Sequence, residues 1–245
     1  MRRIVIIGAS SGIGARVALD FARRGWKVGI AARRIDILET FRQQYPDNIV
    51  CRSLDVTADD AVENFYDLIE CNGGADTVLY AAGVGWSNPE MNLQEDIDTV
   101  GVNVDGFTRI VNAAYRYFRD TANNGRGQIA AITSVAGTMG LGVSAAYSAS
   151  KRYQQTYLQA LAQLAHMQRV AVDITDIRPG FIRTPLLKSD KKYPLLMNLD
   201  YAAPRIELAL LRRRRVQVVD WRWNVLVGFW RLIPSALWCR LPVRL

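Results

Sequence analysis

The stretch "YSASK", Tyr147 to Lys151, places a phenol and an amine four residues apart at the start of a predicted helix. Residues at this spacing share one helix face, so the Lys151 ammonium can lie beside the Tyr147 hydroxyl. A unit charge at about 5 Å, in an effective dielectric near 20, favours the phenolate by about 3 kcal/mol and lowers its pKa by roughly two. Tyr147 is therefore predicted to be a general acid that protonates a forming alkoxide.

Two polar residues upstream can complete this group. Ser134 ends the apolar run "QIAAITS", at the sheet edge where α/β folds bind ligands, and its hydroxyl can bind the same carbonyl oxygen. Asn103, in "GVNVDG", lies on a long predicted helix and can tie Lys151 into a water relay. Structural interpretations remain open: Ser134 as a cap, Asn103 as a partner of backbone groups, and Tyr147 as half-buried core.

The glycines of "GASSGIG" follow the apolar run "IVII" near the start of the chain. Free backbone N–H groups and the dipole of a helix N-terminus make such a turn an anion site, typically for a phosphate. Gly8 would allow the tight turn, Gly12 the close approach of a pyrophosphate, and Gly14 the packing of the helix on the strand. A purely structural turn is the alternative.

The end of the second predicted strand, "GIAARRID", indicates the type of nucleotide. In dinucleotide-binding folds an acid in this region holds the ribose 2′-OH, whereas arginine accommodates a 2′-phosphate. Arg33 and Arg34 can form charge-assisted bonds to that phosphate, which favours NADPH/NADP over NADH. In the alternative interpretation both arginines are solvated and Asp36 holds the ribose.

Alternating apolar runs and helical stretches must position these residues. Strands are predicted at 4–8, 26–32, 48–55, 77–83, 128–134, 170–180 and 216–220, and helices at 12–24, 35–44, 57–71, 92–120, 145–166 and 202–213. Thr57, in "TADD", is predicted to cap the third helix. Because several strands lack polar alternation, the pattern predicts an α/β fold: a doubly wound parallel sheet of about seven strands with helices on both faces.

Taken together, the motifs resemble those of the short-chain dehydrogenase/reductase family, in its compact branch, from about Arg3 to Thr184. They read "GASSGIG", "LDVT" (54–57), "AAG" (81–83), "NVDG" (103–106), "TS" (133–134), "YSASK" and "RPGFIRTP" (178–185). Their order and spacing make the resemblance specific. It implies a Rossmann fold and a nicotinamide cofactor.

The resemblance also implies roles for individual residues. The implied catalytic residues are Ser134, Tyr147, Lys151 and Asn103, and the implied cofactor-binding residues are Gly8, Ser10, Ser11, Gly12, Ile13, Gly14, Arg33, Arg34, Asp55, Val56, Gly83, Tyr147, Lys151, Pro179, Gly180, Ile182 and Thr184. In this scheme hydride passes from the nicotinamide to a carbonyl carbon while Tyr147 protonates the oxygen. Ser134 orients that oxygen, and Asn103 supports the proton relay.

Two departures from the family pattern concern the centre of the sheet. Ile7 stands where the family often has threonine, and Tyr80 with Ala81 replaces a frequent pair of asparagines. The missing polar groups put local hydrogen bonding in doubt more than the chemistry.

Composition limits the remaining function classes. One domain over 1–245 is expected from a chain of 245 residues that is 50% hydrophobic. Three scattered cysteines indicate a reduced, cytoplasmic protein without a metal site. His166 is the one histidine in the sequence, so a Ser-His-Asp triad would have to use it. The net charge of +8 includes the run Arg212 to Arg215, but no nucleic-acid-binding module accompanies it, so no nucleic-acid partner is expected.

Two late segments are expected to shape the substrate pocket. Residues 185–205 correspond to the substrate lid of the resembled family, and 221–245 form an apolar tail with four of the six tryptophans. The tail can serve as lid or subunit contact, as a peripheral membrane contact, or as a channel for a lipid-like substrate. By analogy with the family, a homo-oligomer formed through the fourth and fifth helices is expected.

The leading hypothesis is NADPH-dependent reduction of a ketone or aldehyde, and an apolar lid would favour a hydrophobic carbonyl or alcohol substrate. A nucleotide-binding regulatory or membrane-associated scaffold without turnover is the first alternative. NAD-dependent alcohol oxidation is the second.

Overall fold

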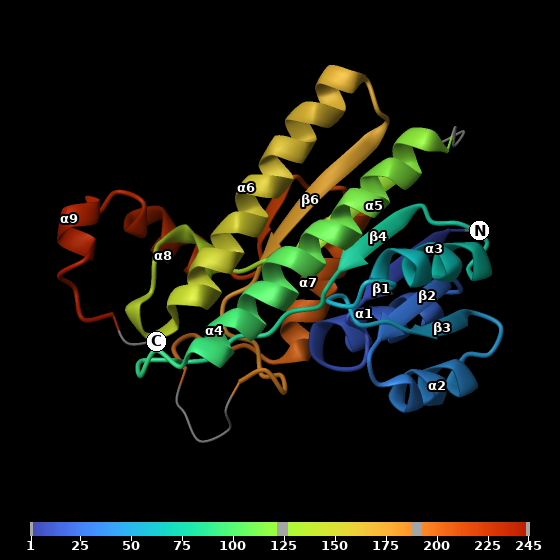
Figure 1. The fold of residues 1–245 in the computed structure, drawn as a ribbon, viewed down its shortest axis with the longest axis horizontal. Helices are drawn as coiled ribbons and strands as arrows, with labels where there is room; N and C mark the ends of the chain where they lie inside the picture. The colour runs from blue at the N-terminus through green and yellow to red at the C-terminus, as the bar shows by residue number, and fades with distance from the viewer. Residues whose placement is uncertain (1, 122–126, 188–192, 244–245) are drawn as a thin grey trace.

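A parallel sheet forms the centre of the molecule in the computed structural model, which describes residues 2–121, 127–187 and 193–243 (Figure 1). Its seven strands are β1 (Arg3–Ile7), β2 (Lys27–Ala32), β3 (Ile49–Ser53), β4 (Thr77–Tyr80), β5 (Gly127–Ile132), β6 (Val172–Arg178) and β7 (Val216–Val218), in the order β3-β2-β1-β4-β5-β6-β7. All neighbours pair in parallel. The doubly wound fold predicted from the sequence is confirmed, and its strand order reverses between β1 and β4, where such folds bind ligands.

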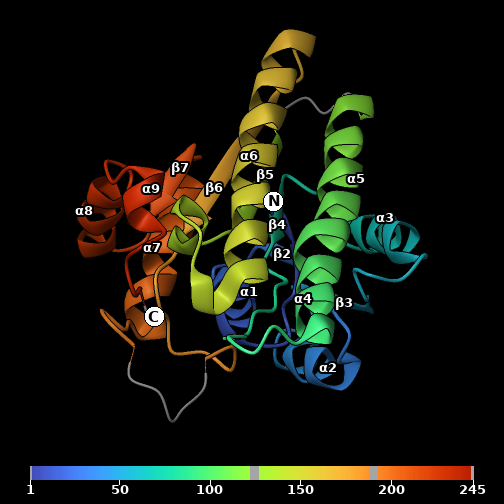
Figure 2. The ribbon, with the colours of Figure 1, turned by 60° about the vertical axis from the view of Figure 1, so that its left-hand side comes forward.

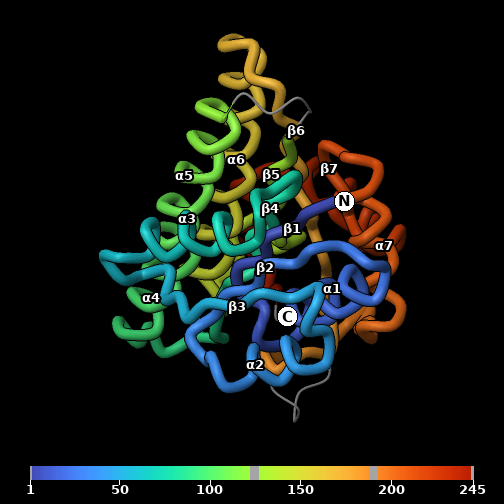
Figure 3. Tube along the Cα trace, turned by 90° about the vertical axis from the view of Figure 1, so that its right-hand side faces the viewer, coloured from blue at the N-terminus to red at the C-terminus, as the bar shows by residue number. Residues whose placement is uncertain are grey.

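Helices cover both faces of the sheet. They are α1 (Gly12–Arg23), α2 (Ile35–Gln44), α3 (Ala61–Cys71), α4 (Leu93–Val100), α5 (Phe107–Asp120), α6 (Ala145–Gln168), α7 (Leu199–Leu211), α8 (Trp221–Trp230) and α9 (Ser235–Trp238). One core joins the sheet to α3, α5 and α6, and a second joins it to α1, α2, α7 and α8 (Figures 2 and 3). Because both faces are covered, β4 and β5 are buried along their whole length, as their continuous apolar runs predicted.

The long helix predicted over 92–120 is divided into three parts. Helix α4 begins behind Asn92, whose side chain accepts hydrogen bonds from the N–H groups of Gln94 and Glu95. A π-helical segment, Gly101–Gly106, then joins α4 to α5. Such wide turns often occur at functional sites, and this one contains Asn103.

The predicted cap of the third helix is wrong. Helix α3 begins at Ala61, and its first-turn neighbour Asp60 provides no side-chain cap. Thr57 instead donates from its backbone N–H and its hydroxyl to one carboxylate oxygen of Asp55, at 3.0 and 2.8 Å. The threonine therefore stabilises the turn after β3 rather than the start of a helix.

The C-terminal segment packs on the domain through α8 and α9, on the opposite side of the molecule from α2 and α3 (Figures 1 and 2). Asp220 caps α8, and Trp223 and Val227 on its inner face are buried in the second core. The Trp238 indole Nε1 donates to the Gly140 carbonyl at 2.7 Å. Among the described residues, no helix is long and apolar enough to cross a membrane.

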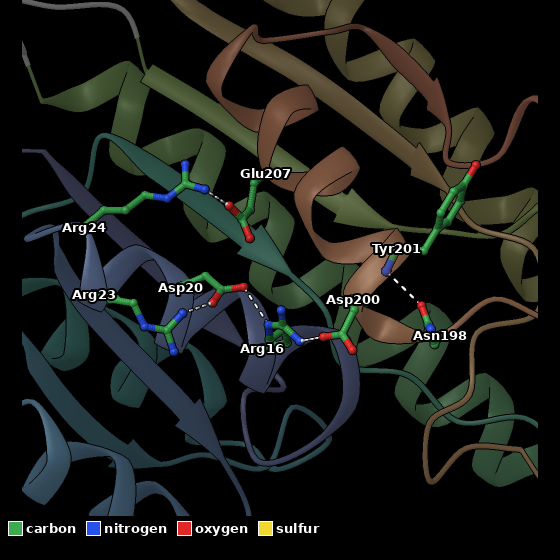
Figure 4. Close-up of polar contacts among 8 residues, drawn as sticks. All are labelled: Arg16, Asp20, Arg23, Arg24, Asn198, Asp200, Tyr201 and Glu207. Atoms are coloured by element: carbon green, nitrogen blue, oxygen red, sulfur yellow. Dashed lines mark hydrogen bonds and ion pairs between the residues drawn. The ribbon is translucent and has the colours of Figure 1, made fainter.

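A network of charged side chains joins α1 to α7 (Figure 4). Arg16 donates to Asp20 at 2.7 Å and to Asp200 at 2.6 Å, and Arg24 pairs with the buried carboxylate of Glu207. Burial, followed by a hydrogen bond with Asp20, raises the pKa of Glu207 to about 7. The network fixes the helix that follows the glycine turn against α7, whose first residues, 199–205, belong to the predicted lid.

Candidate active site

The glycine turn between β1 and α1 has the conformation that its sequence predicts. Gly8 and Gly12 have φ values of +92° and +57°, which favour glycine. A Cβ atom on Gly8 would lie 2.3 Å from the Ala82 nitrogen, and one on Gly14 would lie 2.3 Å from the Gly8 oxygen. The turn therefore packs against the end of β4, and no larger residue fits at either position.

Residues of the glycine turn line a cavity of about 690 Å³ at the carboxyl ends of the strands. Ser11 precedes α1 without capping it through its side chain, so N–H groups of the first turn stay available to an anion. Ser10, Gly12 and Ile13 also line the cavity. The donor set and the space suit the diphosphate of a dinucleotide.

The two predicted phosphate-binding arginines lie at the rim of this cavity. Arg34 donates to the Ser10 hydroxyl at 2.9 Å, which ties the end of β2 to the glycine turn. The pKa of Asp55 is lowered from its usual value. Burial raises it, but the hydrogen bonds from Thr57 and the positive charge of Arg33 outweigh the effect of burial. Both arginine side chains are exposed.

Asp55, Val56 and Gly83 form the adjacent wall of the cavity. Val56 packs so closely on the π-helical segment that a Cβ atom on Gly106 would lie 2.5 Å from a Val56 methyl carbon. A Cβ atom on Gly83 would lie 3.4 Å from both Asn103 Oδ1 and Lys151 Nζ. Gly83 therefore separates the cavity from the polar groups behind it.

Tyr147 and Lys151 lie on the first two turns of α6 and both line the cavity, together with Ser134 after β5. The Lys151 Nζ lies 5.7 Å from the centroid of the Tyr147 ring. Lys151 donates to the Ile132 carbonyl at 3.2 Å and to the Gln154 side chain at 3.0 Å. The sequence did not single out Gln154, although its spacing from Lys151 places both on one helix face.

Ser134 accepts a hydrogen bond from the Ala136 N–H at 3.1 Å and makes a long contact with the Pro179 carbonyl, at 3.4 Å. It thus caps a short 3-10 turn, as its structural interpretation proposed, while its hydroxyl still reaches the cavity. The contact with the Pro179 carbonyl is weak, and the hydroxyl also forms a hydrogen bond with Tyr147.

Burial changes the protonation chemistry of the pair. Burial raises the pKa of Tyr147, and a hydrogen bond with Ser134 acts in the opposite direction without outweighing it. The low phenol pKa expected from the charge of Lys151 alone is therefore not found. Burial also lowers the pKa of Lys151 to about 8, with the charge of Asp176 acting in the opposite direction. The reason is that burial disfavours both the Tyr147 phenolate and the Lys151 ammonium. Lys151 is therefore more easily deprotonated, and the positive charge that would favour the phenolate is more easily lost.

Asn103 lies behind the cavity wall, completely buried. Its side chain accepts from the Val84 N–H at 3.0 Å and donates to the Val84 carbonyl at 2.7 Å and the Ser150 hydroxyl at 3.0 Å. Gln154 donates to the Asn103 carbonyl at 2.9 Å, so Gln154 connects Asn103 to Lys151. Asn103 thus satisfies backbone groups and also belongs to the polar network around Lys151.

Tyr80, which departs from the family pattern, supports the same segment. Its hydroxyl donates to the Val102 carbonyl at 2.8 Å, and its ring packs edge-on against Phe107 at 5.3 Å between centroids. Burial raises the pKa of Tyr80 far above its usual range. A neutral donor inside the sheet therefore replaces the polar residues that the sequence lacks.

Pro179, Gly180, Ile182 and Thr184 complete the far wall. The Pro179 carbonyl accepts from the Val135 N–H at 3.0 Å. Thr184 reaches across to the glycine turn, where a Cβ atom on Gly12 would lie 3.3 Å from its methyl group. A bridge between Ile182 and Met197 closes the base of the predicted lid, of which 188–192 lie outside the described residues.

The remaining part of the cavity is mainly aromatic and aliphatic. Its wall includes Trp86, Phe181, Tyr193, Trp223 and Trp230 together with Leu141, Val143, Leu186 and Leu187. The sequence predicted that the segments 185–205 and 221–245 shape the pocket, but it did not single out their individual residues, although the spacing of Trp223 and Trp230 places them on one face of α8. The tail is thus part of the pocket wall.

The aromatic wall continues as a chain of ring contacts. Centroids lie 5.7 Å apart between Phe181 and Trp223, 6.2 Å between Trp223 and Trp230, and 5.4 Å between Trp230 and Trp238. The Trp223 ring also fills the space beside Gly180, where a Cβ atom would lie 2.1 Å from the indole nitrogen. Gly180 is therefore required by the packing of the tail.

No group of three or more metal-binding side chains occurs among the described residues. The charged and polar groups that line the site include those of the glycine turn, the two arginines, Asp55, Ser134 and the Tyr147–Lys151 pair. This set can bind a dinucleotide and transfer a proton to a carbonyl oxygen.

Comparisons with known proteins agree with this arrangement. A family model described as "short chain dehydrogenase" matches residues 2–194. An uncharacterised oxidoreductase of Myxococcus xanthus is 30% identical over 246 residues, covering 96% of this chain and 94% of that protein.

Two solved structures are similar in fold. A 3-ketoacyl-(acyl-carrier-protein) reductase from Brucella melitensis, complexed with NADH, has a TM-score of 0.78 at 23% identity, covering 89% of this chain and 96% of that one. An alcohol dehydrogenase from Thermococcus sibiricus, complexed with 5-hydroxy-NADP, has a TM-score of 0.74 at 26% identity, covering 89% and 94%.

Proposed function

The chain belongs to the short-chain dehydrogenase/reductase family and is an NAD(P)-dependent oxidoreductase, and from this premise we propose that it reduces an apolar ketone or aldehyde with NADPH. The observation that carries the proposal is the position of Tyr147 and Lys151, one helical turn apart on α6, in a cavity that Ser134 also lines. This is the arrangement required to protonate a carbonyl oxygen during reduction.

In the proposed reaction Tyr147 donates its proton to the carbonyl oxygen, and the Ser134 hydroxyl donates a hydrogen bond to the same oxygen. Bound NADPH would supply the hydride that adds to the carbonyl carbon, so that the products are the alcohol and NADP. The long contact between Ser134 and the Pro179 carbonyl, at 3.4 Å, supports this role because little is lost when the hydroxyl turns to a substrate.

Lys151 would stabilise the phenolate that remains on Tyr147 and hold the cofactor ribose. Its ammonium is kept in place by the Gln154 side chain and the Ile132 carbonyl. Because burial lowers the pKa of Lys151 to about 8, we expect carbonyl reduction to decline as the pH rises through that value. A pH profile of kcat, compared between wild type and Gln154→Ala, measures this effect.

The NADPH preference rests on Arg33 and Arg34 at the cavity rim. The two solved relatives contain NADH and an NADP derivative, so they support NAD(P) binding without choosing between the forms. The preference is measured by titrating the protein with NADPH and with NADH in parallel. Binding is detected as energy transfer from the tryptophans of the cavity wall to the bound nicotinamide. Tighter binding of NADH would contradict it, and would favour Asp36 as the ribose ligand and alcohol oxidation as the reaction.

The aromatic part of the wall supports an apolar substrate. A pocket of this composition gains free energy from buried hydrocarbon and offers few groups to a charged molecule. A panel of ketones and aldehydes of increasing chain length tests this point, with the expectation that kcat/KM rises with chain length.

Replacing Tyr147 with phenylalanine is the decisive test of the reaction. Tyr147→Phe removes the acid but keeps the ring, so kcat is expected to fall at least about a thousandfold while NADPH binding is largely retained. Tyr153→Phe, on the same helix outside the cavity, is the matched control and should retain activity. Equal activity in Tyr147→Phe would refute the mechanism, and absence of turnover in wild type would favour a scaffold protein.

We also propose that residues 1–245 form one domain, with a lid within 185–205 and the tail 221–245 as part of the pocket. The bridge between Ile182 and Met197 supports the lid, since it closes the base of that segment. By family analogy the protein would form a homo-oligomer through the fourth and fifth predicted helices. The fourth corresponds to α4 and α5, and the fifth corresponds to α6. Light scattering of the purified protein measures the oligomeric state.

A further inference from the structure

The outer side of α8 carries a row of exposed apolar side chains. Trp221, Val225, Phe229 and Leu232 are 71, 51, 64 and 78% exposed. Trp221, Val225 and Phe229 follow at a spacing of four residues along one side of the helix, and Leu232 lies in the turn just after its end. We refer to these four residues as the α8 stripe. Large contiguous apolar surface of this kind marks an interaction site in a soluble protein.

The α8 stripe is not a misplaced part of the core. On the inner side of the same helix, Trp223 and Val227 are buried, and Trp230 lines the cavity. These contacts and the Asp220 cap hold α8 on the domain. The outer residues are therefore available to a partner without any loss of the fold.

The charges around the stripe indicate the kind of partner. Residues 221–245 include four arginines and no aspartate or glutamate. Arg222 is paired with Asp220, but Arg231 and Arg240 have no ion pair within the described part of the chain. Tryptophan, phenylalanine and leucine flanked by arginine are typical of helices that lie in the interface of an anionic bilayer.

A second copy of this chain is a poorer match to the same surface. A two-fold contact through the α8 stripe would bring identical patches together, so the unpaired arginines at its side would meet arginines. Like charges across an interface are unfavourable, whereas anionic lipid headgroups complement them.

We propose that the α8 stripe docks the protein on an anionic lipid surface, as a peripheral contact parallel to the membrane. The inner face of the same helix lines the cavity, so docking brings the aromatic wall of the cavity to the lipid surface. This proposal does not depend on the reaction proposed above, because it concerns only the outer side of α8.

Vesicle flotation of the full chain, without cofactor or substrate, tests the proposal. Vesicles of phosphatidylcholine alone are compared with vesicles that also contain phosphatidylglycerol. The protein is expected to float with the anionic vesicles, and to be partly released by added salt. The double variant Phe229→Ser/Leu232→Ser should lower the partition coefficient at least about tenfold, since two apolar anchors are lost.

Met167→Ser is the matched control, because Met167 is 70% exposed on α6, outside the tail. It should float as wild type does. Arg231→Glu provides a second variant that leaves the apolar stripe intact and should weaken binding to anionic vesicles several-fold. Circular dichroism of each variant checks that the fold is retained.

Three results would overturn the proposal. The first is that the wild type floats with neither kind of vesicle. The second is that the Phe229→Ser/Leu232→Ser variant floats as well as the wild type. The third is a dimer, seen by sedimentation without lipid, that the double variant abolishes, because a second copy would then cover the stripe. Since no turnover is measured, none of these results bears on the catalytic proposal.

Discussion

The cavity has two halves that are built in different ways: the cofactor half, which we propose binds NADPH, and the substrate half, which we propose binds the carbonyl compound. The cofactor half is formed by turns that follow the strands, with two positive-φ glycines, backbone N–H groups and arginines. The substrate half is formed by large side chains from the segments after β4, β5 and β6 and from α8. The first half depends on backbone shape, and the second depends on packed side chains.

This difference explains how each half tolerates change. A backbone cradle has no room for an added atom, so a methyl group at Gly8 or Gly14 meets main-chain atoms at 2.3 Å. An aromatic wall can exchange one ring for another apolar group and alter only the space that it encloses. Substitutions in the cofactor half should therefore affect folding and binding together, whereas those in the substrate half should affect substrate choice.

The largest effect is expected for Gly14→Ala. The new Cβ atom would lie 2.3 Å from the Gly8 oxygen, so the start of α1 must move away from the turn. We expect the free energy of unfolding to fall by about 3 kcal/mol and NADPH binding to be lost. Urea denaturation and a cofactor titration measure both. Gly228→Ala is the control, because a Cβ atom there meets nothing within 4 Å; equal stability of the two variants would contradict the rigid cradle.

A smaller effect, confined to cofactor choice, is expected for Arg33→Ala. Loss of a charge-assisted bond to the 2′-phosphate should weaken NADPH binding about tenfold to a hundredfold and leave NADH binding unchanged. The ratio of the two dissociation constants is the measurement. Arg42→Ala, which removes a guanidinium of α2 outside the cavity wall, should leave the ratio as it is. An unchanged ratio in Arg33→Ala would assign the ribose to other residues.

The sequence predicted the cofactor half more completely than the substrate half. Backbone cradles require particular residues at fixed spacing, and so the tight turn at Gly8 and the close packing at Gly14 could be predicted from the sequence, while the role of Gly12 beside a pyrophosphate stays a prediction. The π-helical segment around Asn103 was not foreseen, because its hydrogen bonds to Val84 and Ser150 join residues far apart in the chain. The same applies to Tyr80, whose partner is the Val102 carbonyl.

The substrate half has no comparable signal. Any large apolar side chain can fill such a wall, so the tail could be expected to shape the pocket, but the sequence did not show that Trp223 and Trp230 are the tail residues that line it. Charge at the catalytic pair was also misjudged, because the expected effect of Lys151 on the Tyr147 pKa ignored the burial of both groups. Burial is a property of the whole fold and cannot be read from one helix.

Trp230→Leu changes the substrate half alone. The smaller side chain leaves the wall apolar but enlarges the space, so KM for a long-chain ketone should rise about tenfold while NADPH binding stays unchanged. Steady-state kinetics with short and long ketones measures the change. Phe229→Leu, next to it on the outer side of α8, should match wild type. If Trp230→Leu altered NADPH binding as strongly, the two halves would not be separable.

The smallest effect is expected outside both halves, in the charged network between α1 and α7. The folded pKa of Glu207 is raised from 4.5 to about 7, first by burial and then by the hydrogen bond with Asp20. The native state therefore keeps a proton that the unfolded chain releases, and its stability falls as the pH rises through this window. Asp20, with a lowered pKa, acts in the opposite sense but only below 3.8.

Glu207→Gln should remove this pH dependence. In wild type the free energy of unfolding should fall on the order of 1 kcal/mol as the pH rises from 4.5 to about 7, and the variant should lack this slope. Urea denaturation at several pH values measures it. Glu39→Gln is the control, because the pKa of Glu39 is lowered by its hydrogen bond with Arg42 and its effect lies below this window. Equal slopes in wild type and Glu207→Gln would mean that Glu207 holds no extra proton in the native state.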